Sequence, residues 1–292
     1  TNGTGYSQTC SDIDNDGICD ASYTVLPSVI DELPLKSSKK TVTPIDIESS
    51  ELVVEPSNAE DLVTEGLALF GKGEYEATIT TMDKAIALSP TKFQAWRVKV
   101  LALSKLKKND EAIATLNYAL KLYPESIILW YTLGDIYLLE LTDYEQAEEA
   151  YQKALAIDEG DTHSLINLAF AFDKTGKSEE ALKLYLQATT INPSLTDAWV
   201  KAGNLETRAM RYDQAILYYG KALTLDPGNA FTWNNKGYTL SLLGDYEGAI
   251  KAYQNAIQID NSYDVAWTNL GNAYNALGRK TEALEAYSQR TK

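Results

Sequence analysis

Apolar side chains recur along residues 59–292 with the spacing of amphipathic helices. In the last stretch, Trp267, Leu270, Gly271 and Tyr274 stand at i, i+3, i+4 and i+7. This spacing places them on one face of an α-helix. Gly278 interrupts the pattern, and apolar positions then resume with helical spacing. The pattern predicts a helix-turn-helix hairpin.

The hairpin pattern repeats along the chain, and tryptophan marks the period. The five tryptophans are Trp96, Trp130, Trp199, Trp233 and Trp267. Neighbours are 34 residues apart, except across the gap of 69 residues in the middle, which holds two repeats and one residue inserted near Leu141. Leu165 stands where the missing tryptophan would fall. With tryptophan as position 4, the units are 59–92, 93–126, 127–161, 162–195, 196–229, 230–263 and 264–292.

Small residues fall at the registers where two helices must touch. Position 8 holds Gly66, Val100, Gly134, Ala169, Gly203, Gly237 and Gly271. Alanine recurs at position 27 and at the start of the second helix of the hairpin. A glycine inside a helix costs about 1 kcal/mol relative to alanine, so its recurrence at one register indicates close helix packing. Proline ends four of the second helices, at Pro90, Pro124, Pro193 and Pro227.

This 34-residue pattern resembles the tetratricopeptide repeat (TPR) family, with W-x2-L-G-x2-Y, then A-x3-F/Y-x2-A and a terminal proline. The resemblance implies an all-α fold, a right-handed α-solenoid of seven helix-turn-helix repeats preceded by a short non-helical N-terminal segment. Departures include Lys99 and Lys236 at position 7, Glu206 at position 11 and Thr78 at position 20. The aromatic stripe is interpreted as packing core and not as a cofactor site.

The segment ahead of the repeats divides into residues 1–35, which hold a candidate calcium loop, and residues 36–58, an extended linker or arm. The loop places carboxylates at Asp12, Asp14, Asp16 and Asp20, and the carbonyl of Ile18 adds a further oxygen. Calcium takes six to eight oxygen ligands, so the spacing favours Ca²⁺ over a solvated acidic turn without metal.

The calcium loop resembles known families only in part. An EF-hand needs a glutamate where Tyr23 stands. The D-x-D-x-D-G-x-x-D spacing looks more like thrombospondin type 3 or dockerin loops and like segments between modules of archaeal or bacterial surface proteins. In those relatives the calcium is structural and extracellular.

Cys10 and Cys19 are the only cysteines and flank that loop. Their spacing around a turn favours a disulfide over two free thiols, and disulfides persist in oxidising compartments. Asn2-Gly3-Thr4 also fits a glycosylation acceptor. We therefore expect an extracellular or cell-surface location.

Charge and chemistry narrow the function classes. The net charge is −15, and an acidic surface without a basic stripe disfavours nucleic acid as a partner. No apolar run is long enough for a transmembrane segment. One histidine and two paired cysteines form no catalytic constellation, so we expect no enzyme activity. We expect the single histidine, His163, at the surface early in a helix.

The concave groove of such a solenoid binds partner proteins in the family. By this resemblance, the groove positions supply amides at Asn167, Asn204, Asn234, Asn235, Asn269, Asn272 and Asn275. An amide both donates and accepts hydrogen bonds, so it can hold a peptide backbone. The row resembles the ladder in the superhelix of O-linked N-acetylglucosamine transferases. The alternative is that these residues merely cover a solvated face.

The sequence favours a non-catalytic scaffold that interacts with proteins and assembles with itself. Arg290 stands where the last unit should have alanine, which predicts an uncovered terminal helix. Identical chains could then stack head to tail into a filament or surface structure, as a homo-oligomer or homopolymer. The alternative is a peptide-binding TPR receptor or adaptor module of a larger cell-surface protein.

Overall fold

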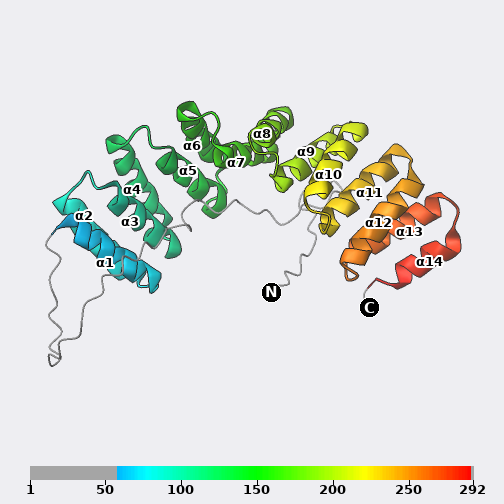
Figure 1. The fold of residues 1–292 in the computed structure, drawn as a ribbon, viewed down its shortest axis with the longest axis horizontal. Helices are drawn as coiled ribbons and strands as arrows, with labels where there is room; N and C mark the ends of the chain where they lie inside the picture. Colours follow the sequence, from blue (N-terminus) through cyan, green and yellow to red (C-terminus); the bar gives the residue numbers. More distant parts are fainter. Residues whose placement is uncertain (1–57, 291–292) are drawn as a thin grey trace, which may run out of the picture. The chain divides into compact units, whose positions relative to one another are not determined.

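A computed structural model describes residues 58–290 of the chain. Within this range the chain forms fourteen α-helices and one π-helical segment, with no strand (Figure 1). The predicted all-α fold of seven helix-turn-helix hairpins is confirmed. The hairpins are α1 (Ala59–Gly71) with α2 (Tyr75–Leu88), α3 (Phe93–Lys105) with α4 (Asn109–Leu122), α5 (Ile127–Asp135) with α6 (Tyr144–Ile157), α7 (Thr162–Lys174) with α8 (Ser178–Ile191), α9 (Thr196–Arg208) with α10 (Tyr212–Leu225), α11 (Ala230–Leu243) with α12 (Tyr246–Ile259), and α13 (Asp264–Ala276) with α14 (Lys280–Ser288).

The hairpins fall into two compact units that divide in the first turn of α7, between Ser164 and Leu165. In the first unit, helices α1 to α6 pack each against the next. In the second unit, the same holds from α8 to α14. Each hairpin therefore buries its apolar faces mainly against its neighbours in sequence, which is the packing of repeat proteins.

Each hairpin turns through one residue in the left-handed conformation, at position 15 or, in the third hairpin with its inserted residue, at position 16. Glycine occupies it at Gly73, Gly176, Gly244 and Gly278, whereas Lys107, Thr142 and Met210 adopt the same positive φ. The next amide donates back to a carbonyl in the last turn of the first helix, as from Asp245 N to Leu240 O at 2.9 Å. This bond is typical of a Schellman cap, and it fixes where the second helix begins.

Large side chains at position 24 lie over the small residues at position 8. A Cβ added to Gly203 would lie 2.6 Å from Cε1 of Tyr219, and Gly134 and Tyr151 repeat this relationship. The close approach explains why glycine recurs at this register in spite of its low helix propensity. The alanines at position 27 are fully buried in six hairpins: Ala85, Ala119, Ala154, Ala188, Ala222 and Ala256.

The tryptophans join neighbouring hairpins. Each indole Nε1 donates to the carbonyl six residues earlier, in the turn that follows the preceding helix, as from Trp233 to Pro227 at 3.0 Å. The corresponding bonds join Trp96 to Pro90, Trp130 to Pro124, Trp199 to Pro193 and Trp267 to Asn261. Trp96 is buried and the other four are half-buried. The tryptophan stripe is thus packing core on one side and surface on the other.

The residue inserted in the third repeat is absorbed by a π-helical turn. The segment η2 (Ile136–Glu140) follows α5 directly, and Leu141 N donates to Ile136 O at 3.2 Å. A π-turn accommodates one extra residue without shifting the helix that follows. The second helix of that hairpin, α6, therefore keeps its packing register.

Candidate protein-interaction site

The predicted groove asparagines differ in exposure. Asn167, Asn204, Asn234 and Asn235 are buried, with exposed fractions of at most 4%. Asn269 is half-buried, and Asn272 and Asn275 are exposed. Only the last three, all on α13, present amide atoms that a peptide could reach from solvent.

Three of the buried asparagines, together with the half-buried Asn269, join neighbouring repeats. Asn235 on α11 donates to Oδ1 of Asn204 on α9 at 3.2 Å. Asn269 on α13 donates to Oδ1 of Asn234 on α11 at 3.0 Å. Buried amides need such partners because an unsatisfied polar group costs free energy. These four side chains therefore stabilise the stack formed by the first helices of the last three hairpins.

In three hairpins the tyrosine hydroxyl at position 24 donates to a polar residue at position 9 of the same hairpin. Tyr219 donates to Asn204 at 2.7 Å, and Tyr287 donates to Asn272 at 2.8 Å. In the third hairpin Asp135 takes that position and accepts from Tyr151 at 2.7 Å. The tyrosine at position 24 thus packs its ring on position 8 and hydrogen-bonds through its hydroxyl to the side chain at position 9.

The expectation that His163 lies at the surface is wrong. It does stand early in α7, but only 7% of it is exposed. Its Nε2 lies 2.9 Å from Oδ1 of Asp135, and its ring centroid lies 4.6 Å from that of Tyr131. The Asp135 carboxylate is a hydrogen-bond partner for the buried imidazole. No pattern in the sequence indicates that these two residues meet. Burial raises the pKa of Tyr131 in this cluster to about 12.

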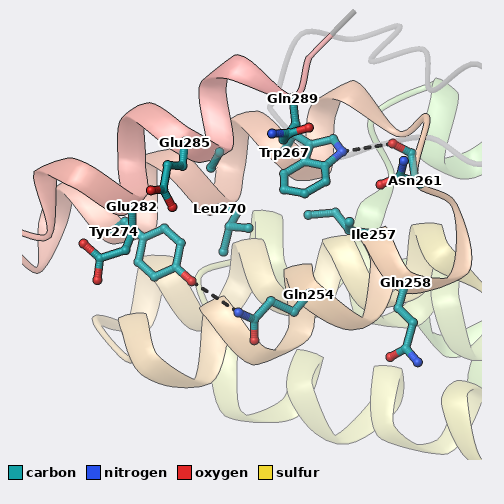
Figure 2. Close-up of a pocket in the computed structure, with 11 residues that line it drawn as sticks. Gln254, Ile257, Gln258, Asn261, Trp267, Leu270, Tyr274, Glu282, Glu285 and Gln289 are labelled. Carbon is teal, nitrogen blue, oxygen red and sulfur yellow. Dashed lines mark hydrogen bonds between the residues drawn. The ribbon is translucent and has the colours of Figure 1, made fainter. Parts of the chain in front are cut away.

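The second unit carries an open groove between α12 and α14, with α13 as its floor (Figure 2). Its volume is about 560 Å³, within the range of small ligand pockets. Trp267, Leu270 and Tyr274 come from α13. The side toward α12 is formed by Ile257 and three polar residues, Gln254, Gln258 and Asn261. The wall toward α14 is formed by Glu282, Glu285, Ala286 and Gln289.

The floor of the groove is apolar, and its wall on α14 is acidic. Leu270 and Tyr274 are at least nine-tenths buried, whereas Trp267 is half-buried. Tyr274 OH accepts from Gln254 Nε2 at 3.2 Å. Glu282 accepts from Arg279 at 2.9 Å, and this hydrogen bond lowers the pKa of Glu282. Glu285 is exposed and forms no ion pair within residues 58–290.

The sequence pattern did not predict this groove. A signal was present, however, at position 26 of the repeat, which faces the tryptophan. Lys221 and Tyr118 occupy that position in two earlier hairpins and lie against Trp199 and Trp96. In the last hairpin the position holds Gln289, and within residues 58–290 no lysine, arginine or aromatic ring lies over the indole of Trp267.

The predicted calcium ligands and the cysteine pair lie outside the described residues, as does the arm ahead of Asn58. Residues 58–290 contain no group of three or more histidine, cysteine, aspartate or glutamate side chains placed to hold a metal ion. Over the same range, no helix combines the length and the apolar character needed to cross a bilayer.

Family models match nearly all of the described helices. Models described as tetratricopeptide repeat match residues 63–127, 125–194, 166–230 and 218–251, and one described as TPR repeat matches residues 237–278. The repeats of this chain belong to the tetratricopeptide repeat family. The TPR pattern inferred from tryptophan, glycine and alanine spacing is therefore confirmed.

Curated TPR relatives match parts of the chain. A TPR repeat-containing protein of Methanocaldococcus jannaschii is 30% identical over 141 residues, 44% of this chain and 25% of the relative. The human tetratricopeptide repeat protein 13 is 24% identical over 53% of this chain and 18% of its own length. A small glutamine-rich TPR protein of Mycosarcoma maydis is 36% identical over 35% of this chain and 29% of its own length. The matches span less than a third of each relative.

Solved structures with the same fold include MamA and YrrB. MamA superposes with a TM-score of 0.55 at 22% identity, covering 57% of this chain and 90% of MamA. YrrB, described as a TPR protein with an unusual peptide-binding site, superposes with a TM-score of 0.57 at 23% identity, covering 63% of this chain and 95% of YrrB. At this identity the likeness establishes the fold.

Proposed function

We propose that this TPR chain is a non-catalytic, extracellular protein-interaction scaffold whose copies assemble head to tail into a filament or surface structure. The TPR repeats make it a protein–protein interaction module. The self-assembly, the structural calcium and the cell-surface location are the proposed part. They draw on the acidic loop, on the cysteine pair and on the surface of the last hairpin.

One observation carries the proposal of self-assembly: Leu284 on α14 is 70% exposed. The equivalent apolar residues of earlier hairpins are buried or half-buried: Ile79, Ile113, Leu182, Ile216 and Ile250. Ile250, for example, belongs to a core cluster that includes Leu270 of the following hairpin. Leu284 therefore marks a stacking face that each earlier hairpin presents to its successor. A second copy of the chain can cover that face, and repetition of the contact gives a filament.

Negative-stain microscopy of the 292-residue chain at rising concentration tests this function. Filaments or growing oligomers support it, and dispersed monomers throughout the series contradict it. Removal of residues 1–57 tests the role of the arm and should weaken assembly. The cut keeps Asn58, because its side chain accepts from Glu60 N at 2.9 Å and caps α1.

A peptide-binding role is the second candidate, and the exposed amides of α13 favour it. Asn275 is exposed, and its Nδ2 lies 3.5 Å from Tyr287 OH. Asn272 is also exposed and lies one helical turn before it. The printed description of YrrB names a peptide-binding site in that protein. Substitution of Asn272 and Asn275 by alanine should reduce peptide capture if this surface binds peptides, and unchanged capture would exclude it.

A further inference from the structure

Side chains of this protein cover the indole of tryptophan in several hairpins. Lys221 Nζ lies 4.0 Å from the ring centroid of Trp199, and Lys236 Nζ lies 5.4 Å from that of Trp233. A cation over an aromatic face is attracted by the ring electrons. The repeats thus show, within one chain, that lysine is a suitable neighbour for this tryptophan.

Trp267 of the last hairpin has no such cover from the part of the chain that the structure describes. Gln289 stands at the position of Lys221, and Leu270 stands at the position of Lys236. No lysine or arginine of residues 58–290 lies over the Trp267 ring. The half-buried indole borders the groove between α12 and α14 instead, beside Gln289 (Figure 2).

The chemistry of the groove fits a basic segment with apolar neighbours. Leu270 and Ile257 offer an apolar floor, and Trp267 offers a ring face for a cation. Glu285 provides an exposed carboxylate, whereas Glu282 is already bonded to Arg279. A lysine side chain can lay its methylenes on the floor and keep its ammonium near the carboxylate.

Two parts of another copy are candidate occupants of the groove, helix α1 and the segment 33–42, and they differ in charge. Helix α1 carries Glu60, Asp61 and Glu65 on its exposed surface, so its approach would place acid against acid. The segment 33–42, Leu-Pro-Leu-Lys-Ser-Ser-Lys-Lys-Thr-Val, has the opposite character. It contains Lys36, Lys39 and Lys40, the only basic residues ahead of α1, and apolar residues flank them.

We propose that the groove lined by Trp267, Leu270 and Glu285 binds segment 33–42 of a second copy of this chain. The inference rests on the proposed self-assembly and names the contact that links successive copies. Its electrostatic part is exposed, so the association should weaken as salt rises. The apolar part should keep some association at high salt.

Two variants of the full chain test the contact from its two sides. The arm variant carries Lys36→Glu, Lys39→Glu and Lys40→Glu, and the groove variant carries Gln289→Lys. The new lysine stands at the register of Lys221, where it should cover Trp267 and repel the arm. The matched control is Asn255→Lys, which makes a similar charge change at the same register of the preceding hairpin. Circular dichroism checks that all variants keep the helical signal.

Sedimentation velocity of each chain over a range of concentrations gives the readout. We expect the dissociation constant for self-association to rise at least tenfold in the arm variant and in the groove variant. The Asn255→Lys control should stay within about twofold of the unchanged chain.

An equimolar mixture of the arm and groove variants separates contact between copies from contact within one copy. The intact groove of one variant can take the intact arm of the other, so we expect dimers and no larger species. A mixture that stays monomeric would overturn the contact between copies. Variants that assemble like the unchanged chain would overturn the groove contact while self-assembly stands. An unchanged chain that never associates would refute the proposed assembly itself.

Discussion

The ring of Tyr219 packs directly on the backbone of Gly203, so closely that a Cβ on that glycine would lie 2.6 Å from Cε1 of the ring. The same pair recurs at equivalent positions in the third, sixth and seventh hairpins. Where position 24 holds the smaller Leu116, position 8 holds Val100. The size of one side chain thus limits the size of the other, because the two helices pack closely.

Gly203→Ala should destabilise the second unit by about 1–2 kcal/mol, because the clash with Tyr219 outweighs the gain in helix propensity. The fourth hairpin has alanine at position 8, Ala169, together with tyrosine at position 24, Tyr185. The fold therefore tolerates one methyl group at this register, so we expect a moderate loss. Urea unfolding followed by circular dichroism measures the change.

Gly220→Ala is the control for that prediction. Gly220 lies inside α10, and a Cβ there would meet nothing within 4 Å. The substitution should therefore stabilise the protein by up to about 1 kcal/mol. A loss of stability at both glycines would contradict the packing argument, because it would show that helix spacing is not the deciding factor.

Met210→Gly should stabilise the hairpin of α9 and α10. Met210 adopts a φ of 60° at the turn, and its side chain is 75% exposed. Little packing is lost, and the left-handed conformation costs a non-glycine residue about 1–2 kcal/mol. Thermal unfolding should show a higher midpoint. Gly244→Met at the equivalent turn, where φ is 89°, should lower the midpoint, and the prediction fails if both changes act in the same direction.

Asp135→Leu should destabilise the first unit by about 2–3 kcal/mol. Asp135 accepts from Tyr151 and lies within hydrogen-bond distance of His163 Nε2, so its removal leaves buried polar groups without their acceptor. Asp135→Asn keeps an acceptor oxygen, as Asn204 does at the same register, and should cost less than about 1 kcal/mol. Equal losses for the two variants would show that the acceptor oxygen does not matter.

Tyr131→Phe should make the chain more resistant to alkaline unfolding. Burial raises the pKa of Tyr131 from 10.0 to about 12, so its stabilisation is complete below pH 10 and is lost as the pH rises toward 12. In that window the unfolded chain releases a proton that the folded chain retains, which costs about 1.4 kcal/mol per pH unit. Without the hydroxyl, the free energy of unfolding should fall less steeply with pH. An identical slope would contradict the assigned burial.

The sequence was sufficient to predict the hairpins because their packing is local. The registers of tryptophan, glycine and alanine predicted the repeat, and the gap near Leu141 predicted an insertion that the structure absorbs as a π-turn. The burial of His163 was not predictable, because it depends on Asp135, 28 residues earlier. The α12–α14 groove was missed for a related reason. Gln289 does not cover Trp267 as Lys221 covers Trp199. A repeat consensus describes the contacts that the repeats share, so it does not show where one repeat lacks a contact.

The same distinction applies to the asparagine row. The sequence allows amides at groove positions either to hold a peptide or to cover a solvated face, whereas Asn204 and Asn235 bond to each other across two hairpins. A sequence reveals that a residue is polar and lies on one face of a helix. Whether that face is exposed to solvent or packed against the next hairpin depends on how the hairpins stack in three dimensions.

Sedimentation of the 292-residue chain and its Leu284→Glu variant tests the proposed assembly most directly. Leu284 is 70% exposed on the last hairpin, and Leu217, at 51% on α10, provides a matched control as Leu217→Glu. We predict that the mean mass of the unchanged chain and of the control rises with concentration, whereas the mean mass of Leu284→Glu rises less at every concentration. Monomers in all three samples, or equal association of Leu284→Glu and the unchanged chain, would contradict assembly through the last hairpin.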